Sequence, residues 1–531
     1  MEYNLFLRKL ENLRKYIAMH NVDGIFLNTN DEYISEYSSD ECNLLLQSTG
    51  FTGSNGCAII TQYETLFFTD GRYLLQAKSE ILPCFEIIDI KHFFDVIKQK
   101  NFTQIVLNYR LVTMDFARKM MHENPQLSLI NDDYYLKSKF QNRGGFYPIS
   151  EKLTGLSSSE KIEIVQNHLK ENGKSAFLVT NPQSICWLLN IRGIDEECTP
   201  VYKTTLLITR TSYILNPDIS TIRGNVYIES SINYFQFHEL KWVTTFKSNL
   251  ITELKTQKNQ FEIEGVINAH KIDGKILTHF LHDLEQNYIG FSEFQVGENL
   301  LKSRRKKPYF ATPSFATICG CNENGAIIHY NAKENSCKTL EKNSIVLLDS
   351  GGQYIDQTGE NQVFGTTDVT RTVFLGENPP EEYQKWFTLV LKGHIAVATA
   401  KLTSETLSRE VDALARKPLL EQGYNYNHGT GHGVGAFLSV HESGAGIGAE
   451  SNLKFRSGMV ISNEPGAYFE GKFGIRIENL LLVRQKPDST LFFETITLVP
   501  IQEKSINFEM LTQEETNWVL EYNARCLENL S

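Results

Sequence analysis

The chain has 531 residues, of which 41% are hydrophobic and 22% charged, and its formal net charge is −11. This length exceeds what one compact core accommodates, so we expect two to four domains. The acidic balance argues against a nucleic-acid partner. No run in the sequence approaches the roughly 20 apolar residues that span a bilayer, so we expect no membrane partner either.

The N-terminus lacks the features of an export signal. Residues 1–24 carry charges throughout, where a signal peptide has a continuous apolar segment. The nine cysteines, an odd number, follow no spacing typical of a disulfide framework. Reduced thiols in the cytosol explain this pattern most simply, and we therefore expect a cytoplasmic protein.

A helix followed by a short strand occurs twice in the first half of the chain. Apolar residues at helical spacing end at Ile17, just before a β-type run. The same order returns with a helical pattern that ends near Leu169. Paired β-type runs follow each copy, and the repeat therefore predicts two similar α/β domains, residues 1–147 and 148–250.

The remaining residues, 251–531, form a predicted α+β domain. Longer helices are expected at about 260–286, 381–402 and 405–422, alternating with strong β runs. The last stretch, 511–531, predicts a C-terminal helix. This domain carries nearly all the side chains that are candidates for chemistry.

Two aspartates lie in β-type runs of this domain. Asp349 ends the apolar run 344–349, which is typical of a buried strand. A carboxylate there must be paired, capped or bound to a cation, because leaving it bare in an apolar setting costs too much free energy. Asp368 lies in the alternating run 365–374, with threonines on the same face. Two aspartates from neighbouring strands suit a shared divalent cation.

Two histidines, His428 and His432, lie among the glycines of the segment 428–435. On a helix both rings would share a face, but the glycines favour a loop that closes tightly on a site. A phosphate-binding loop is disfavoured, because the strand–loop–helix context and the Lys-Ser/Thr pair are missing. A third imidazole, His441, follows in the sequence.

Two glutamates complete the candidate set. Glu464 ends a strand-like run, and Glu478 shares a face with Arg476 in the alternating run 473–480. Four carboxylates with one or more imidazoles suit two metal ions about 3.5–4 Å apart. Such a site activates water and polarises a carbonyl, while nearby imidazoles, including His329, steady an intermediate or carry protons.

The order Asp, Asp, His, Glu, Glu resembles that of the pita-bread metallopeptidases, and within them the three-domain aminopeptidase P (Xaa-Pro aminopeptidase). Matching motifs extend over nearly the whole chain, at residues 50–54, 69–73, 187–193, 324–330, 349–354, 365–372, 428–435, 464–466 and 474–479. The resemblance implies two homologous creatinase-like N-terminal α/β domains followed by a pita-bread metallopeptidase domain, 251–531. It also implies two divalent ions, most often Mn²⁺ with Zn²⁺ or Co²⁺ as alternatives, and a homodimer.

The resemblance also implies a role for each site residue. Five residues would hold the ions, with Asp349 on one, Asp368 and Glu478 bridging both, and His432 and Glu464 on the other. Glu464 would also accept a proton from the attacking water. Three histidines would contact substrate or intermediate, namely His329, His428 and His441. Arg476 would support the bridging carboxylates from behind, and Arg72 would reach toward the site from the first domain.

This chain departs from the family between Asp356 and Gly365, where the eight residues 357–364 are inserted. If they only lengthen a hairpin tip, both strands keep their register and Asp349 stays a ligand. The turn-like sequence at 359–361 favours this interpretation. If the register slips by one residue, a ligand leaves the site, and Asp356 is then the alternative to Asp349.

The implied activity is hydrolysis of the N-terminal Xaa-Pro bond of peptides whose second residue is proline. Such a bond lacks an amide N–H and carries a rigid ring, so general aminopeptidases handle it badly. One alternative is a prolidase that acts on Xaa-Pro dipeptides, which the tandem N-terminal domains disfavour. Another is an inactive pita-bread domain that serves as a binding module, which the intact ligand positions disfavour.

Overall fold

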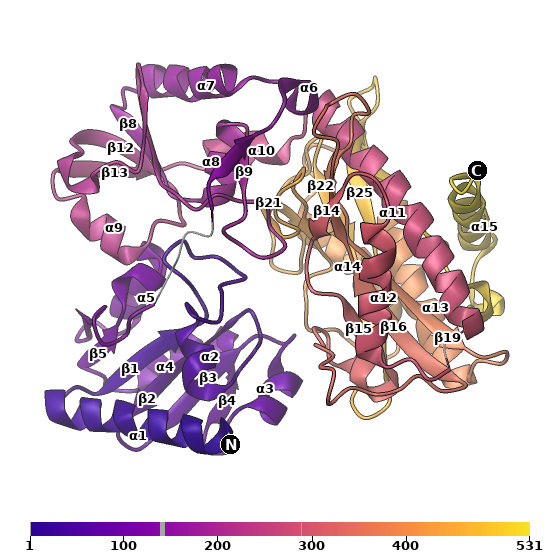
Figure 1. Ribbon diagram of the computed structural model, residues 1–531, viewed down its shortest axis with the longest axis horizontal. Coiled ribbons are helices and arrows are strands. Elements are labelled where there is room, and N and C mark those ends of the chain that lie inside the picture. The colour runs from indigo at the N-terminus through magenta and orange to yellow at the C-terminus, as the bar shows by residue number, and fades with distance from the viewer. Residues whose placement is uncertain (1, 139–143, 288) are drawn as a thin grey trace. The chain divides into compact units, whose positions relative to one another are not determined.

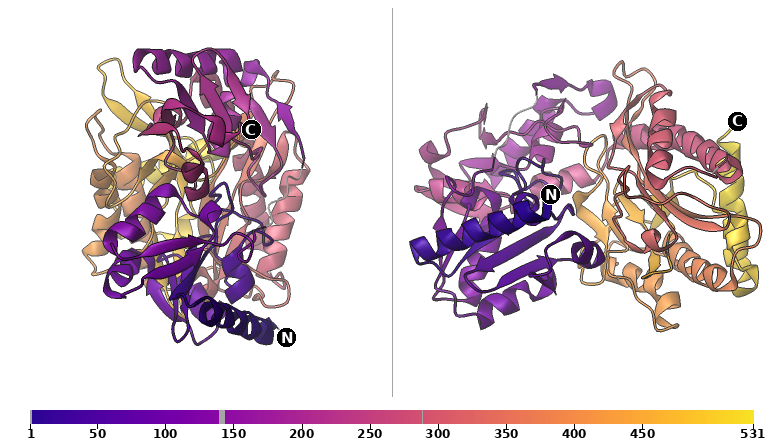
Figure 2. Two further views of the ribbon diagram at one scale, coloured as in Figure 1. Left: turned by 90° about the vertical axis from the view of Figure 1, so that its left-hand side faces the viewer. Right: turned by 60° about the horizontal axis from the view of Figure 1, so that its bottom comes forward.

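A computed structural model describes residues 2–138, 144–287 and 289–531 (Figures 1 and 2). The chain forms two compact units. The N-terminal unit comprises Met1–Pro148, Ser157–Glu197 and Val201–Ile251, and the C-terminal unit comprises Ile149–Leu156, Cys198–Pro200 and Thr252–Ser531. Within the described ranges, no helix combines the length and the apolarity that crossing a membrane requires.

The first sheet of the N-terminal unit has the strand order β4-β3-β2-β1-β5-β6. Its strands are β1 (Gly24–Asn28), β2 (Gly56–Thr61), β3 (Thr65–Thr69), β4 (Glu86–Asp89), β5 (Gln104–Leu107) and β6 (Ser128–Asn131). The accompanying helices are α1 (Glu2–His20), α2 (Leu44–Thr49), α3 (Leu74–Glu80), α4 (Phe93–Gln99) and α5 (Met114–Glu123). Leu10 and Ile17 of α1 are buried in one core with Ile25 and Ala58 of the sheet, so the predicted apolar face of this helix packs inward. Figure 1 draws α1 alongside this sheet.

The second sheet of this unit has the order β11-β10-β8-β12-β13. Its strands are β8 (Ala176–Val179), β10 (Leu206–Thr209), β11 (Tyr213–Leu215), β12 (Gly224–Ile228) and β13 (Val243–Lys247), with helices α7 (Ser158–Glu171), α8 (Pro182–Leu188) and α9 (Tyr234–Glu239). Strand β8 pairs antiparallel with β10 and parallel with β12, just as β1 pairs with β2 and β5. The shared arrangement confirms two similar α/β domains, while their boundaries at residues 147 and 250 stay predictions.

The four helices that the sequence predicts in the C-terminal unit occur as α11 (Gln260–Asn287), α13 (Glu381–Ala398), α14 (Ser408–Leu420) and α15 (Gln513–Glu528). The structure adds α12 (Glu293–Arg305) and the short α6 (Glu151–Thr154) and α10 (Leu250–Thr256). Ser292 and Thr512 begin α12 and α15 with capping boxes, in which side chain and backbone satisfy each other's orphan groups. Figure 1 and the right-hand view of Figure 2 draw α15 at an edge of this unit.

The strands of the C-terminal unit form four sheets among the described residues. One contains β14 (Phe310–Pro313), β17 (Gly352–Ile355) and β18 (Phe364–Thr366), and a second contains β15 (Ile318–Cys321), β16 (Ser344–Ser350) and β19 (Val369–Leu375). The third has the order β21-β20-β22-β25-β26, with β20 (Gly431–Gly433), β21 (Glu442–Ile447), β22 (Val460–Asn463), β25 (Asn479–Gln485) and β26 (Leu491–Thr495). The fourth pairs β23 (Gly466–Phe469) with β24 (Phe473–Arg476).

Two alternating runs that the sequence predicts as single strands are each broken in the structure. The run 365–374 divides into β18 and β19 on either side of Thr367 and Asp368. The run 473–480 divides into β24 and β25 on either side of Ile477 and Glu478. The reason is that each run passes from one sheet to another, so its backbone leaves one set of hydrogen-bonded partners before it meets the next.

Candidate metal centre

All four carboxylates of the predicted site lie where the chain leaves one sheet for another. Asp349 is next to last in β16, and the chain enters β17 of a different sheet directly after Gly351. Asp368 lies between β18 and β19, Glu464 between β22 and β23, and Glu478 between β24 and β25. Asp349 keeps its ladder partners Ile318 and Thr370, whereas Asp368, Glu464 and Glu478 lie outside the strands, so carboxylates carried by different sheets can face a common point.

Asp368, His432 and Glu478 meet at such a point. Each offers a ligand atom, and these atoms lie within 4.8 Å of one another. Nε2 of His432 is 3.4 Å from Oδ2 of Asp368 and 3.3 Å from Oε1 of Glu464. Three carboxylates therefore surround one imidazole nitrogen, and separations of this size are typical of neighbouring ligand atoms on one cation bound at about 2.1 Å.

The backbone around His432 explains part of the glycine content of the segment 428–435. A Cβ atom at Gly431 would lie 1.8 Å from the carbonyl oxygen of Ser462, so glycine is required for β20 to approach β22. Ser462 then hydrogen-bonds to both His432 and Glu464. Its hydroxyl accepts a hydrogen bond from the backbone N–H of His432 (2.9 Å) and donates one to Oε1 of Glu464 (3.0 Å).

Asp349 is tied to the opposite side of the site through a buried arginine. Nη2 of Arg476 donates to Oδ2 of Asp349 (2.6 Å), and Nε of Arg476 donates to the hydroxyl of Thr370 (3.0 Å). That hydroxyl in turn donates to Oε2 of Glu478 (2.8 Å). Arg476 therefore orients two of the predicted ligands at once, one directly and one through Thr370.

The carboxylates of this site have the chemistry that a divalent cation satisfies. Oδ1 of Asp349 and Oδ1 of Asp368 are buried and have no hydrogen-bond partner among the described residues. Burial and the carboxylates of Asp349 and Glu464 raise the pKa of Asp368 well above its usual value. Burial and the same crowding, led by Asp368, raise the pKa of Glu478. Without positive charge at the centre these acids repel one another, so the residues present fit a bound metal.

Of the histidines that the resemblance assigns to substrate, His441 packs against this cluster and His428 is linked to it through Tyr468 and Arg476. The ring centroids of His441 and His432 are 4.3 Å apart, at an interplanar angle of 84°. Nδ1 of His428 lies 2.7 Å from the carbonyl oxygen of Gly429, which assigns the proton to Nδ1, and Nε2 then accepts from the hydroxyl of Tyr468 (2.9 Å). His329 is half-buried in the segment that follows β15.

Tyr468 is a residue of this site that sequence reasoning missed. Its hydroxyl accepts from Nη1 of Arg476 (2.9 Å), so Tyr468 joins that guanidinium to His428. No sequence motif contains Tyr468, and the one signal in the sequence that could have pointed to it is its position shortly after Glu464. Arg72, which the resemblance also brought forward, lies in the N-terminal unit and pairs with Asp70 (2.8 Å).

The insertion forms the tip of the β17–β18 hairpin. The two strands pair in regular register, with Tyr354 opposite Gly365 and Ile355 opposite Phe364. Both oxygens of Asp356 are engaged within the tip. Oδ1 accepts from the hydroxyl and backbone N–H of Thr358, and Oδ2 accepts from the backbone and side chain of Asn361. Asp356 is therefore a loop residue, and the register that would have exchanged it for Asp349 does not occur.

The fold and the clustered ligands are those of a metal-dependent hydrolase. Metallopeptidase family M24 matches residues 264–485, and the C-terminal region of peptidase M24 matches 489–531. The Creatinase/Prolidase N-terminal domain matches residues 9–134, and a second family of the same description matches 140–261.

Relatives of known name extend over almost the entire chain. A probable Xaa-Pro aminopeptidase P of Laccaria bicolor is 32% identical, over 98% of this chain and 90% of that protein. Xaa-Pro aminopeptidase 1 of Dictyostelium discoideum is 30% identical, over 97% and 91%. The crystal structure of X-prolyl aminopeptidase from Caenorhabditis elegans, described as a cytosolic enzyme with a di-nuclear active site, superposes with a TM-score of 0.91 at 28% identity, over 99% and 96%. The chain belongs to the Xaa-Pro aminopeptidase P family of M24 metallopeptidases, which confirms the predicted creatinase-like and pita-bread architecture.

Proposed function

We propose that the protein removes the first residue from peptides with proline in second position, by hydrolysis of the Xaa-Pro bond. The observation that carries this proposal is the convergence of Asp368, His432 and Glu478, with Glu464 beside the imidazole. The relatives named Xaa-Pro aminopeptidase support the substrate class.

The proposed cofactor is a pair of divalent ions, which Asp349, Asp368, His432, Glu464 and Glu478 would hold, with Asp368 and Glu478 shared as the resemblance implies. The di-nuclear site of the C. elegans relative supports the number of ions. Bound there, the ions supply Lewis-acid activation of a water and of the scissile carbonyl. Carboxylate oxygens with one imidazole suit Mn²⁺, our proposed ion, with Zn²⁺ and Co²⁺ as alternatives.

The chain's own residues would then move the protons. Glu464 accepts a proton from the water that adds to the carbonyl carbon, and this proton passes to the proline nitrogen as the C–N bond breaks. His329 and His441 donate hydrogen bonds to the oxygen that gains negative charge in between, and His428, whose ring nitrogens are engaged by Gly429 and Tyr468, contacts the substrate. Arg476 keeps Asp349 oriented throughout.

We also propose a homodimer and a cytoplasmic location. Helix α15 exposes the apolar side chains of Leu520 and Leu527, which a subunit contact would cover. The cytosolic location of the C. elegans relative supports the second proposal. Sedimentation of the purified chain tests the first, and fractionation of the source cells tests the second.

A substrate comparison tests the activity. The full chain, stripped of metal and reloaded with Mn²⁺, is offered an Xaa-Pro-Yaa tripeptide, the matching Xaa-Pro dipeptide and a tripeptide with alanine in second place. We expect turnover to be fastest with the Xaa-Pro-Yaa peptide and to disappear on chelation. Preference for the dipeptide would identify a prolidase instead, and activity that survives exhaustive chelation would remove the two-metal mechanism.

A further inference from the structure

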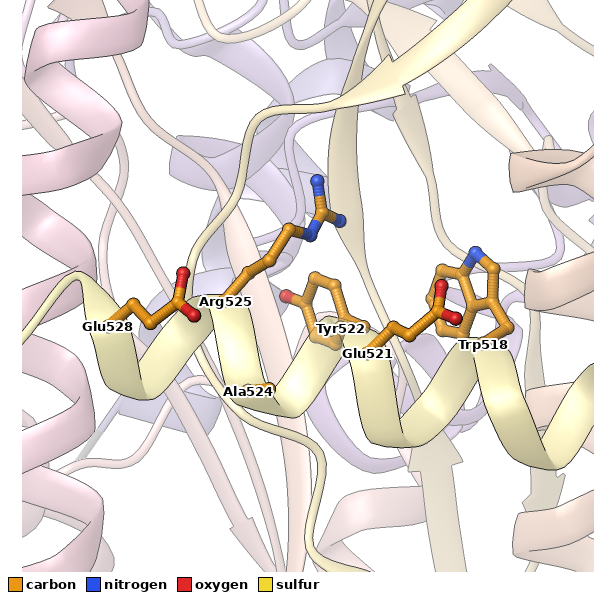
Figure 3. A pocket seen from close by; sticks show the side chains of 6 residues that line it. All are labelled: Trp518, Glu521, Tyr522, Ala524, Arg525 and Glu528. Carbon is orange, nitrogen blue, oxygen red and sulfur yellow. The ribbon is translucent and has the colours of Figure 1, made fainter.

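The side chain of Tyr522 in the C-terminal helix α15 is buried and points toward the strands of the metal centre. Val519, Tyr522, Asn523 and Cys526 are its buried residues, and Tyr522 is 1% exposed. Figure 3 shows Trp518, Tyr522 and Arg525 projecting from the same side of the helix. The rings of Trp518 and Tyr522 stack, with centroids 5.2 Å apart, which fixes the direction of the phenol.

The hydroxyl of Tyr522 belongs to a polar cluster that water does not reach. It accepts a hydrogen bond from Nη2 of Arg371 (2.9 Å) and lies 3.0 Å from Oδ1 of Asn479. The carbonyl oxygens of Val499 (2.9 Å) and Thr497 (3.1 Å) are further acceptors for its single proton. In a dry environment each of these hydrogen bonds constrains its partners more strongly than it would in water.

Arg371, which contacts Tyr522, also donates hydrogen bonds to the backbone at the proposed metal ligand Glu478. Its Nη1 donates to the carbonyl oxygens of Glu478 (2.6 Å) and Thr370 (2.8 Å), and its Nη2 donates to Oδ1 of Asn479 (2.8 Å). Thr370 is the residue whose hydroxyl holds the carboxylate of Glu478. The guanidinium of Arg371 therefore hydrogen-bonds to the backbone of Glu478, to the side chain of Asn479 and to the backbone of Thr370. Thr370 in turn orients the carboxylate of Glu478.

Asn479 completes this chain of contacts. Its Oδ1 accepts from Arg371 and lies beside the Tyr522 hydroxyl, and its Nδ2 donates to Nε2 of the buried His394 (3.0 Å). Both ends of the amide are thus held. Glu478 lies at a sheet crossing, where no regular ladder holds it on both sides, so this polar cluster supplies the constraint that a strand interior would otherwise give.

We propose that Tyr522 is a positioning residue of the metal centre, which acts through Arg371 and Asn479 to hold Glu478 in place for its ions. The C-terminal helix is then part of the machinery that sets metal affinity. Tyr522 touches neither substrate nor ion. The inference rests on the proposed two-metal function, and it assigns a role to the region 489–531 beyond closing the fold.

The test compares two tyrosine variants of the full chain. Tyr522→Phe removes the hydroxyl and keeps the stacked ring. Tyr383→Phe is the matched control, because Tyr383 of α13 is also fully buried and its hydroxyl donates to Ser505 (3.1 Å), which contributes to none of the ligand-bearing strands. Mn²⁺ binding to the metal-free proteins is measured by titration calorimetry, and thermal unfolding of the same samples reports the loss of stability.

We expect Tyr522→Phe to raise the dissociation constant for Mn²⁺ by roughly threefold to tenfold, less than the 10–100-fold typical of groups that contact a ligand directly. Tyr383→Phe should leave the dissociation constant for Mn²⁺ unchanged. Both variants should lower the unfolding temperature of the metal-free protein by a similar amount. Equal Mn²⁺ affinities for the two variants would overturn the inference about Tyr522 and leave the proposed function standing. Failure of the wild-type chain to bind Mn²⁺ would overturn the proposed function, and the inference with it.

A second measurement needs no variant. Coupling between two sites is reciprocal, so if α15 strengthens metal binding, then metal must strengthen the docking of α15. We expect added Mn²⁺ to slow amide hydrogen exchange in α15, residues Gln513–Glu528, of the wild-type chain. Unchanged exchange in α15, with Mn²⁺ shown to be bound, would contradict the coupling.

Discussion

Asp349 and Asp356 have opposite surroundings although the sequence offered either as a ligand. Oδ1 of Asp349 is buried without a hydrogen-bond partner among the described residues, and its Oδ2 faces Arg476. Both oxygens of Asp356 are satisfied by Thr358 and Asn361. A carboxylate with all its acceptors engaged by its own loop has nothing left to offer a cation.

We therefore expect Asp349→Asn and Asp356→Asn to differ in metal content. Asp349→Asn should lose one ion per chain and at least about 100-fold in kcat/KM, because an amide cannot replace a charged ligand of a two-metal site. Asp356→Asn should keep both ions and most of the activity. Elemental analysis of dialysed protein and peptide hydrolysis provide the measurements. Metal loss in Asp356→Asn would mean that the hairpin tip contributes to the site after all.

At the scale of elements, the ligand segments were predictable and their geometry was not. Alternation correctly placed Arg476 and Glu478 toward one region, since Arg476 reaches Asp349 and Glu478 meets Asp368. Alternation also predicted unbroken strands, whereas Asp368 and Glu478 lie at breaks. A sequence period reports the face of a strand but carries no information about which sheet a strand joins, because that depends on partners distant in the chain.

The short helix α10 (Leu250–Thr256) illustrates another feature that the sequence could not reveal. Its Lys255 donates to Oε1 of Glu442 (2.7 Å), and Lys258 just beyond the helix donates to Oε2. All three side chains are buried, and Glu442 directly follows His441. The ion pairs therefore anchor the start of β21, next to a proposed substrate-contacting histidine, to a segment almost 190 positions earlier.

We expect Glu442→Gln to destabilise the C-terminal unit by about 3–5 kcal/mol at neutral pH, because it leaves buried ammonium groups without their anion. Burial opposes ionisation of Glu442, but Lys255 and Lys258 outweigh it and hold its pKa below the usual value. The stabilisation is therefore full above the unfolded pKa of about 4.3 and is lost as the pH falls through the lower folded value. Urea unfolding of wild type and variant from pH 7 down to pH 3 measures this difference, and a gap that widens toward acid would contradict it.

For the whole molecule, the sequence predicts three successive domains, whereas each of the two compact units combines three separate segments of the chain. The segment Ile149–Leu156 packs within the C-terminal unit although residues of the N-terminal unit follow it in the chain. Composition gave no sign of this, because the segment has the polar character of a linker. Its attachment depends on long-range hydrogen bonds. Nδ2 of Asn259 donates to the carbonyl of Thr154 (2.7 Å), and Nε2 of Gln362 donates to that of Leu153 (3.3 Å).

Gln362 lies in the insertion 357–364, so the lengthened hairpin tip has a structural use. It binds α6 and also donates to the carbonyl of Phe261 in α11 (2.9 Å). The side chain of Leu153 in α6 is fully buried. If α6 is a working part of the C-terminal unit, then truncating Leu153 must weaken that unit and leave the N-terminal unit untouched.

We expect Leu153→Ala to cost about 2–5 kcal/mol, the usual range for removing a buried leucine side chain. Calorimetry of the full chain with and without Mn²⁺ identifies the transition of the C-terminal unit, because bound metal raises the transition of the unit that holds it. Leu153→Ala should lower this metal-sensitive transition. The control Leu178→Ala, a fully buried leucine of β8 in the N-terminal unit, should lower the other one. If Leu153→Ala instead lowered only the metal-insensitive transition, α6 would belong energetically to the domain that follows it in the chain, and its packing in the C-terminal unit would contribute little to stability.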